Sequence, residues 1–140
     1  MAKIVYFDMD GTIANLYAVN NVFERLDNLD AKVYEEATPI IKYIEMLKEF
    51  KAMGYKVIIL SCLGMISEKQ FDIDTIEYKN KWLDKYVGKE YTDDRMFIEY
   101  TKHKENYVKE GGILVDDDDK VLCNWKWDRI KAENKHKGKH

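Results

Sequence analysis

The sequence predicts an α/β fold built on a doubly wound parallel sheet, and two observations support this. First, apolar runs alternate with longer helical segments along the 140 residues. Second, the runs KIVYFD (3–8) and KVIILS (56–61) are apolar between their end residues and do not alternate with polar ones. Such strands are buried on both faces, which is typical of a parallel sheet between layers of helices. The length fits one domain with its own core, and we expect residues 1–140 to form it.

Three segments follow the first strand before the next one begins. Residues 15–26 repeat apolar side chains every three or four positions, as an amphipathic helix does, whereas residues 27–37 are polar and predict a short helix or a loop. Thr38 before Pro39 combines a capping hydroxyl with a proline at the first helical position. A long helix is therefore expected from this point up to Gly54.

The second half of the chain continues the alternation of strands and helices. Ser67 is a candidate cap for the long helix in this half. The expected elements are, in order, a strand over 56–61, a helix over 66–87, a strand over 95–100, a short helix over 103–110 and a strand over 112–115.

Composition excludes several classes of protein. Hydrophobic residues make up 46% of the chain and aromatic residues 13%, which excludes wholesale disorder. The net charge of -3 is small and the charges are interspersed, so neither a nucleic acid nor a membrane is predicted as a partner. Cys62 and Cys123 form no close pair, and aspartates soon follow the apolar start, so we expect a cytoplasmic protein without a signal peptide.

Polar side chains follow each of the predicted strands. In doubly wound sheets, ligands bind at the carboxyl ends of the strands, where the loops gather. These positions hold, strand by strand, Asp8, Asp10, Gly11 and Thr12, then Ser61, then Lys102 and Lys104, and finally Asp116 and Asp117. Carboxylates, a hydroxyl and an ammonium group are therefore expected at one edge of the sheet.

The last of these strands runs into four consecutive aspartates, in GGILVDDDDK (111–120). Such a run can be a solvated turn, a remnant of an engineered protease site or half of a metal site. Protease-site remnants lie at chain termini, whereas VLCNWKWDRI continues this chain with residues of the buried type. The choice between a turn and a metal site depends on the aspartates that follow the first strand.

The segment FDMDGT (7–12) carries groups suited to phosphoryl transfer. Asp8 and Asp10 lie two positions apart, so on an extended segment their side chains point the same way. One carboxylate can attack phosphorus while the other handles the proton of the leaving group. Gly11 permits a tight turn and a close backbone approach, and Thr12 can form local hydrogen bonds.

A carboxylate nucleophile and a dianionic phosphate ester repel each other, and a divalent cation removes this repulsion. Mg²⁺ usually takes one or two carboxylates together with substrate oxygens and water. Asp116 supplies a second carboxylate from across the sheet. Ser61 and Lys104 would then bind the non-bridging oxygens, whose charge must be stabilised in the transition state.

Four segments, in order, resemble the four motifs of haloacid dehalogenase-type phosphatases. They are FDMDGT, ILS at the end of the second strand, a lysine before a short helix, and ILVDD. The continuation DDDDKVLCNW is similar to the same region of 5'(3')-deoxyribonucleotidases and their small bacterial and phage relatives. The resemblance covers residues 3–14 and 56–125, and it implies a Rossmann-like parallel sheet with a reduced helical cap at about 14–38.

The resemblance also implies roles for individual residues. Asp8 would be the nucleophile that forms an aspartyl-phosphate, and Asp10 would be the general acid and base. The residues implied to bind phosphate are Ser61, Lys104, Thr12 and Gly11. Those implied to bind Mg²⁺ are Asp8, Asp10, Asp116 and Asp117. Within the metal set, Asp10 would contribute its backbone carbonyl, and Asp117 would hold the surroundings of Asp116 in place.

Three further groups of residues need an interpretation. Lys102 competes with Lys104 for the phosphate-binding role, and the family's spacing to Tyr107 and Val108 favours Lys104. Two of the four aspartates, Asp118 and Asp119, match no motif and are expected at the solvated start of the next helix. The aromatic pair Trp125 and Trp127 could stack on bases, but packing against the sheet edge is favoured, and the early chain end could remove an edge strand.

These implications lead to an expected function. The chain would be a Mg²⁺-dependent phosphomonoesterase of (deoxy)nucleoside monophosphates, with Tyr17, Phe23 and Tyr34 available to stack on a base. The partner would be a small phosphorylated substrate, and the protein a monomer or small homo-oligomer. Alternatives are a phosphatase of another small or bulky phosphoester, a phospho-receiver module, or a non-catalytic binding module of similar fold. A receiver is disfavoured because the second strand ends in serine, and a non-catalytic relative because both Asp8 and Asp10 are present.

Overall fold

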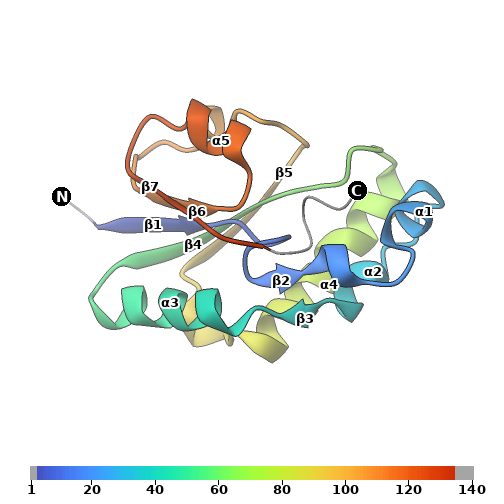
Figure 1. Cartoon of the computed structure of the whole chain (residues 1–140), viewed down its shortest axis with the longest axis horizontal. Coiled ribbons are helices and arrows are strands. Elements are labelled where there is room, and N and C mark those ends of the chain that lie inside the picture. The colour runs from blue at the N-terminus through green and yellow to red at the C-terminus, as the bar shows by residue number, and fades with distance from the viewer. Residues whose placement is uncertain (1–2, 135–140) are drawn as a thin grey trace.

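The central sheet is parallel throughout (Figure 1). In the computed structural model, which describes residues 3–134, five strands lie in the order β5-β4-β1-β6-β7, with parallel pairing between neighbours. The strands are β1 (Ile4–Phe7), β4 (Lys56–Cys62), β5 (Asp94–Ile98), β6 (Ile113–Asp116) and β7 (Arg129–Lys131). The chain moves outward from β1 to β5 and then returns to the other side of β1, so a topological switch point lies between β1 and β6. The predicted doubly wound α/β fold is confirmed.

Helices cover both faces of this sheet. α3 (Ile41–Ala52) and α4 (Lys69–Tyr86) lie on one face, and the short α5 (Asp119–Asn124) lies on the other (Figure 1). Alternate residues of β1 point to opposite faces. The cluster formed with α3 and α4 contains Val5 and Phe7, and the cluster formed with α5 contains Ile4 and Tyr6. None of these four side chains is more than 5% exposed, so β1 lies at the centre of the core.

Thr38 and Pro39 do not start a helix. They form the two-residue strand β3 (Thr38–Pro39), which pairs antiparallel with β2 (Ala14–Asn15), and α3 begins after Ile40. The N–H of Ile40 donates to the carbonyl of Ile13 at 2.8 Å and extends this pairing. Pairing with a distant segment therefore outweighs the local preference of a Thr-Pro pair for a helix start.

The cap of α4 is Glu68 and not Ser67. The Glu68 carboxylate accepts hydrogen bonds from the backbone N–H groups of Gln70 and Phe71, at 3.2 and 2.7 Å. Ser67 donates instead to the side chain of Asp72. A carboxylate is favoured here because it also complements the helix dipole. The remaining connections contain two 3-10 helices, η2 (Lys89–Tyr91) and η3 (Lys104–Tyr107).

Residues 14–39 form a small cap between β1 and α3, where the sequence predicts a continuous helix over 15–26. The cap consists of β2, the 3-10 helix η1 (Leu16–Ala18), α1 (Val22–Asp27), α2 (Val33–Glu36) and β3. Asn21 has a left-handed backbone with φ 56°, which separates η1 from α1. The cap has its own apolar cluster, and Phe71 of α4 packs into it. This contact holds the cap beside α4, at one end of the sheet (Figure 1).

The sequence left open the loss of an edge strand after Trp127, but the chain supplies one there. β7 pairs with β6, and the N–H of Ala132 donates to the carbonyl of Asp116 at 2.9 Å. Trp125 is buried and packs edge-on against Tyr6, with ring centroids 5.5 Å apart. The expected packing in the core is therefore confirmed for Trp125, whereas Trp127 is 38% exposed.

Among residues 3–134, no helix has both the length and the apolar character needed to cross a bilayer.

Candidate active site

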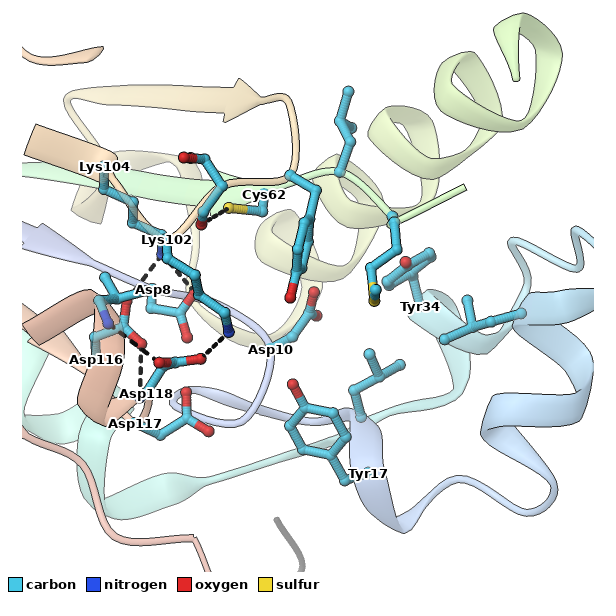
Figure 2. A pocket seen from close by; sticks show the side chains of 18 of the residues that line it. Asp8, Asp10, Tyr17, Tyr34, Cys62, Lys102, Lys104, Asp116, Asp117 and Asp118 are labelled. Carbon is cyan, nitrogen blue, oxygen red and sulfur yellow. Dashed lines mark hydrogen bonds and ion pairs between the residues drawn. The ribbon is translucent and has the colours of Figure 1, made fainter. Parts of the chain in front are cut away.

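The sheet brings the carboxylates after β1 and β6 together (Figure 2). Asp8 directly follows β1, Asp116 ends β6, and the parallel register places Phe7 opposite Val115. The N–H of Asp8 donates to the carbonyl of Val115 at 2.9 Å, so this register continues to the strand ends. Asp8, Asp116 and Asp117 lie on the same side of a pocket in Figure 2. The expected meeting of carboxylates from two strands is therefore observed.

A cavity of about 710 Å³ lies over this edge of the sheet, and its two ends differ in character. The charged end is lined by Asp8, Asp10, Lys102, Lys104, Asp116, Asp117 and Asp118. The apolar end is lined mainly by Leu16, Tyr17, Phe23, Leu26 and Tyr34 of the cap and by Leu63 and Met65, whereas the ring of Tyr100 lies 5.5 Å from the Nζ of Lys102. The volume is in the range of small-molecule sites. The division suits a ligand with an ionic head and an apolar body.

Lys104 links the two strand ends. Its Nζ donates to Asp8 Oδ1 at 2.9 Å, to Asp116 Oδ2 at 2.9 Å and to the carbonyl of Leu60 at 3.0 Å, and the side chain is buried. Lys102 is placed differently, because it forms an ion pair with Asp118 and is partly exposed. Of the two candidate lysines, the structure therefore places Lys104 between the predicted nucleophile and the predicted metal ligand.

Burial and the shared Lys104 determine the pKa values of Asp8 and Asp116. Burial, the largest influence, raises the pKa of Asp8, but the charge and hydrogen bonds of Lys104 and the hydrogen bond from Thr12 help to hold it below its ordinary value. Burial first, and then the neighbouring charge of Asp8, raise the pKa of Asp116 to about 6. Burial lowers the pKa of Lys104, but the two carboxylates outweigh this and raise it above that of an ordinary lysine. Asp8 is thus an ionised carboxylate at neutral pH.

The turn after Asp8 is built around Gly11 and Thr12. The hydroxyl of Thr12 lies 3.0 Å from Asp8 Oδ2 and 3.4 Å from Asp117 Oδ1, and Thr12 is fully buried. Gly11 has φ 86°, and a Cβ at this position would lie 2.2 Å from Asp117 Oδ2. Only glycine therefore lets the turn approach Asp117 this closely. Neither Gly11 nor Thr12 is part of the cavity lining.

Ser61 lies below the cavity surface, next to a lysine that the sequence analysis missed. Lys79 of α4 is fully buried, and its Nζ donates to Ser61 Oγ at 2.8 Å and to Asp10 Oδ2 at 2.9 Å. It also donates to the carbonyl of Cys62 at 2.8 Å. Among the described residues, the site therefore contains two buried ammonium groups, and Lys79 binds Asp10 while Lys104 binds Asp8.

A sequence signal for Lys79 exists, although it is weak. Phe71, Thr75, Lys79 and Trp82 are spaced as one face of a helix, and all four are buried. A lysine on the buried face of a helix is unusual, because lysine is almost never fully buried unless it is paired. Its spacing predicts burial, but only the structure identifies Asp10 as its partner.

The carboxylates at this edge fit a hard divalent cation. Asp8, Asp116 and Asp117 are buried and each offers one oxygen, and these oxygens lie within 4.8 Å of one another. Mg²⁺ and similar ions prefer such oxygen donors. The side chain of Asp10 is directed to Lys79, so the contribution expected from this residue, a backbone carbonyl, stays a prediction.

The aspartate run divides between the site and the following helix. Asp118 is the N-cap of α5, and its Oδ1 accepts from the N–H groups of Lys120 and Val121 at 2.9 and 3.1 Å. Asp119 has a side chain that is 79% exposed and pairs with Lys131. The structure thus places both at the start of the helix, as the sequence predicts, although Asp118 also lines the cavity rim.

Aromatic side chains of the cap face the carboxylates across the cavity (Figure 2). The rings of Tyr17 and Phe23 are stacked, with an interplanar angle of 20° and centroids 6.2 Å apart. Burial first, and then the nearby carboxylates led by Asp10, raise the pKa of Tyr17, so its hydroxyl stays neutral. Tyr34 is buried, and its ring lies 4.8 Å from the Nζ of Lys79.

Comparisons with known proteins find similarity only at the level of structure, since no family model and no curated protein matches the sequence. A chain of the Pnkp1/Rnl/Hen1 complex matches 94% of this chain with a TM-score of 0.70 and 20% identity. The match covers 46% of that chain, so the present chain spans less than half of its length.

Two further matches carry family names. A dehalogenase matches 98% of this chain and 89% of its own, with a TM-score of 0.58 and 11% identity. The putative HAD-hydrolase YfnB from Bacillus subtilis, whose structure contains magnesium, matches 93% and 86%, with a TM-score of 0.54 and 8% identity. At such identities the likeness concerns the fold. The chain therefore has the fold of the haloacid dehalogenase-type hydrolases.

Proposed function

We propose that the protein is a Mg²⁺-dependent phosphomonoesterase that forms an aspartyl-phosphate on Asp8. The observation that carries this proposal is the buried cluster of Asp8, Asp116 and Asp117, with Lys104 at 2.9 Å from two of its members. The cluster lies at the charged end of a cavity, at the strand ends where doubly wound sheets bind ligands. The fold is one that HAD-type hydrolases share.

The metal would be held by Asp8, Asp116 and Asp117, with the backbone carbonyl of Asp10 as a further ligand. Once bound, Mg²⁺ would neutralise the repulsion between the substrate phosphate and the nucleophile. The donor set supports this assignment, because it offers buried carboxylate oxygens alone. The magnesium found with YfnB is a parallel from a protein of the same fold.

The reaction would proceed in two steps at Asp8. In the first, a carboxylate oxygen of Asp8 attacks phosphorus, the bond from phosphorus to the leaving oxygen breaks, and Asp10 gives its proton to that oxygen. In the second, Asp10 takes a proton from water, whose oxygen attacks phosphorus and releases Asp8 with inorganic phosphate. The lowered pKa of Asp8 supports its role as the nucleophile, because the carboxylate must be ionised to attack.

The phosphoryl oxygens would be bound by Lys104, Ser61, Thr12 and Gly11. Lys104 has the strongest support, because its ammonium group lines the cavity and lies beside Asp8. The other three lie behind the cavity surface, so they would contribute when the phosphate approaches Asp8 closely. The charge of Lys104 and the hydrogen bonds of all four residues would act most strongly in the transition state.

The substrate would be a small phosphorylated molecule with an apolar body, and we propose a (deoxy)nucleoside monophosphate. The stacked rings of Tyr17 and Phe23 supply a flat surface for a base at the apolar end of the cavity. A second candidate is the terminal phosphate of a nucleic acid strand. It is favoured by the structural likeness to a chain of the Pnkp1/Rnl/Hen1 complex, which is an RNA repair complex.

We also propose that residues 1–140 work as one domain with the cap as its roof, and as a monomer or small homo-oligomer. The cap and the sheet both line the same cavity, which supports a single functional unit. Cys62 and Cys123 are free thiols, as expected of a protein that works in the reducing cytoplasm.

Phosphate release from a panel of monophosphates, with Mg²⁺ and with EDTA, tests the proposal. The panel contains 4-nitrophenyl phosphate, the four deoxynucleoside 5'-monophosphates and an oligonucleotide with a terminal phosphate. We expect release that depends on Mg²⁺ and is lost in the Asp8→Asn variant. Release from the oligonucleotide alone among the nucleotides would favour the second candidate, and full activity in EDTA would contradict the metal assignment.

A further inference from the structure

We propose that Lys79 is a positioning residue that orients Asp10 and Ser61 for phosphoryl transfer. This inference rests on the proposed function, since it gives Lys79 a part in the same reaction. Three observations carry it, namely the use of all three ammonium donors, the identity of the groups that they contact, and the complete burial of the side chain.

Each donor of the Lys79 ammonium group has a partner at the site. A lysine has three N–H donors, and those of Lys79 meet Asp10 Oδ2, Ser61 Oγ and the carbonyl of Cys62, at 2.8–2.9 Å. The ring of Tyr34 lies on a further side, 4.8 Å from the Nζ. The ammonium group therefore has a fixed position, set by the turn after β1, the end of β4 and the cap.

The burial of Lys79 indicates a role beyond packing of α4. Phe71 and Trp82 supply the apolar contacts of this helix with the cap and the sheet. A charged lysine between them costs desolvation free energy that an apolar residue would avoid. The ammonium group offsets this cost through its hydrogen bonds with Asp10, Ser61 and the Cys62 carbonyl and through its contact with the Tyr34 ring, and Asp10 and Ser61 are predicted site residues.

The contact with Asp10 fixes which carboxylate oxygen faces the substrate. Oδ2 is bound to Lys79, and in the described part of the chain Oδ1 accepts no hydrogen bond. Since Asp10 lines the cavity, Oδ1 is the oxygen that can exchange a proton with the leaving group and with water. Without Lys79 the carboxylate could rotate, and the distance over which the proton moves would no longer be fixed.

The contact with Ser61 fixes a hydroxyl in a similar way. Because Ser61 Oγ accepts a hydrogen bond from Lys79, its own proton must point away from the ammonium group. The two buried lysines thus divide the site, with Lys104 at Asp8 and Lys79 at Asp10. Each carboxylate of the FDMDGT segment has its own cation.

The test compares two substrates that share a single aromatic ring but differ in leaving group. 4-Nitrophenolate is stable as an anion and leaves without a proton, whereas the alkoxide of benzyl phosphate needs one. The parameter kcat/KM includes the steps up to departure of the leaving group, so it reports proton donation. Lys79→Met should lower kcat/KM by about a hundredfold for benzyl phosphate and by less than about tenfold for 4-nitrophenyl phosphate.

A second readout does not depend on the leaving group. With 4-nitrophenyl phosphate, Lys79→Met should still phosphorylate Asp8 but hydrolyse the aspartyl-phosphate slowly, because Asp10 must then activate water. We expect a burst of 4-nitrophenolate of about one equivalent per active site, followed by a slow steady rate. Lys81→Met, on the exposed face of the same helix, is the matched control and should behave as the wild type.

The outcomes separate this inference from the proposed function. If the wild type hydrolyses neither substrate, the proposed function is wrong. If the wild type hydrolyses both and Lys79→Met lowers kcat/KM equally for the two, or lowers neither, Lys79 has only a structural role. Thermal unfolding shows whether Lys79→Met is folded. If it is not, Lys79→Gln replaces it in the same comparison, because this shorter, uncharged side chain has only two N–H donors and cannot hold all three partners of Lys79.

Discussion

Asp118→Ala should lower stability and leave turnover nearly intact. The substitution removes two hydrogen bonds to the first turn of α5, at 2.9 and 3.1 Å, and an ion pair with Lys102. Loss of an N-cap costs about 1 kcal/mol, and loss of a partly exposed ion pair costs about 0.5 kcal/mol. Unfolding entropy is about 2.1 cal/mol/K per residue, or about 0.3 kcal/mol/K for 140 residues. The melting temperature should therefore fall by about 5 °C.

Asp116→Ala, in contrast to Asp118→Ala, should act mainly on turnover and on the Mg²⁺ requirement. Asp116 belongs to the buried carboxylate cluster and binds Lys104, so its loss should raise the Mg²⁺ concentration needed for activity and lower kcat/KM by about a hundredfold or more. Asp118 is not a member of that cluster, so Asp118→Ala should change kcat/KM by less than about tenfold, or about 1.4 kcal/mol of barrier.

Thermal unfolding and Mg²⁺ titrations of 4-nitrophenyl phosphate hydrolysis measure both effects. Asp119→Ala is the control, since this exposed side chain should change neither melting temperature nor activity noticeably. If Asp118→Ala proved as damaging to kcat/KM as Asp116→Ala, the division of the aspartate run into a site pair and a helix start would be wrong.

Three further predictions concern the metal, the shared lysine and the cap. EDTA should abolish hydrolysis of 4-nitrophenyl phosphate and added Mg²⁺ should restore it, whereas unchanged activity would contradict the metal site. Lys104→Met should destabilise the metal-free protein by about 3–5 kcal/mol in denaturant unfolding, because Asp8 and Asp116 lose their only buried cation in the described chain, and an unchanged midpoint would contradict this. Tyr17→Ala or Phe23→Ala should lower kcat/KM more for a deoxynucleoside monophosphate than for 4-nitrophenyl phosphate, while equal losses would make both rings purely structural.

The fold and the meeting of strand-end carboxylates were predictable because both follow from local patterns. Apolar runs identify buried strands, and the parallel arrangement then places their carboxyl ends at one edge. Asp8 and Asp116 could thus be brought together from their positions alone, and the structure has them beside each other. The pairing of Thr38 and Pro39 with β2 was not predictable, since it depends on a partner far along the chain.

Lys79 shows a second limit of sequence patterns. Helical spacing assigns position 79 to the buried face of α4, where an apolar residue is expected, and it says nothing about the group that the side chain meets. The position of Asp10 opposite this face depends on the turn at Gly11 and on the packing of α4 against the sheet. Partners that come from separate elements become visible only when the elements are assembled.

The central claim is that Asp8 is the residue that becomes phosphorylated, and a direct measurement can test it. The Asp10→Asn variant, in which hydrolysis of the intermediate should be slow, is mixed with 4-nitrophenyl phosphate and Mg²⁺, quenched in acid and digested for mass spectrometry. The account predicts a phosphoryl group on Asp8, absent without Mg²⁺ and absent in the Asp8→Asn variant. A phosphoryl group on another residue, or turnover by Asp8→Asn at the wild-type rate, would contradict it.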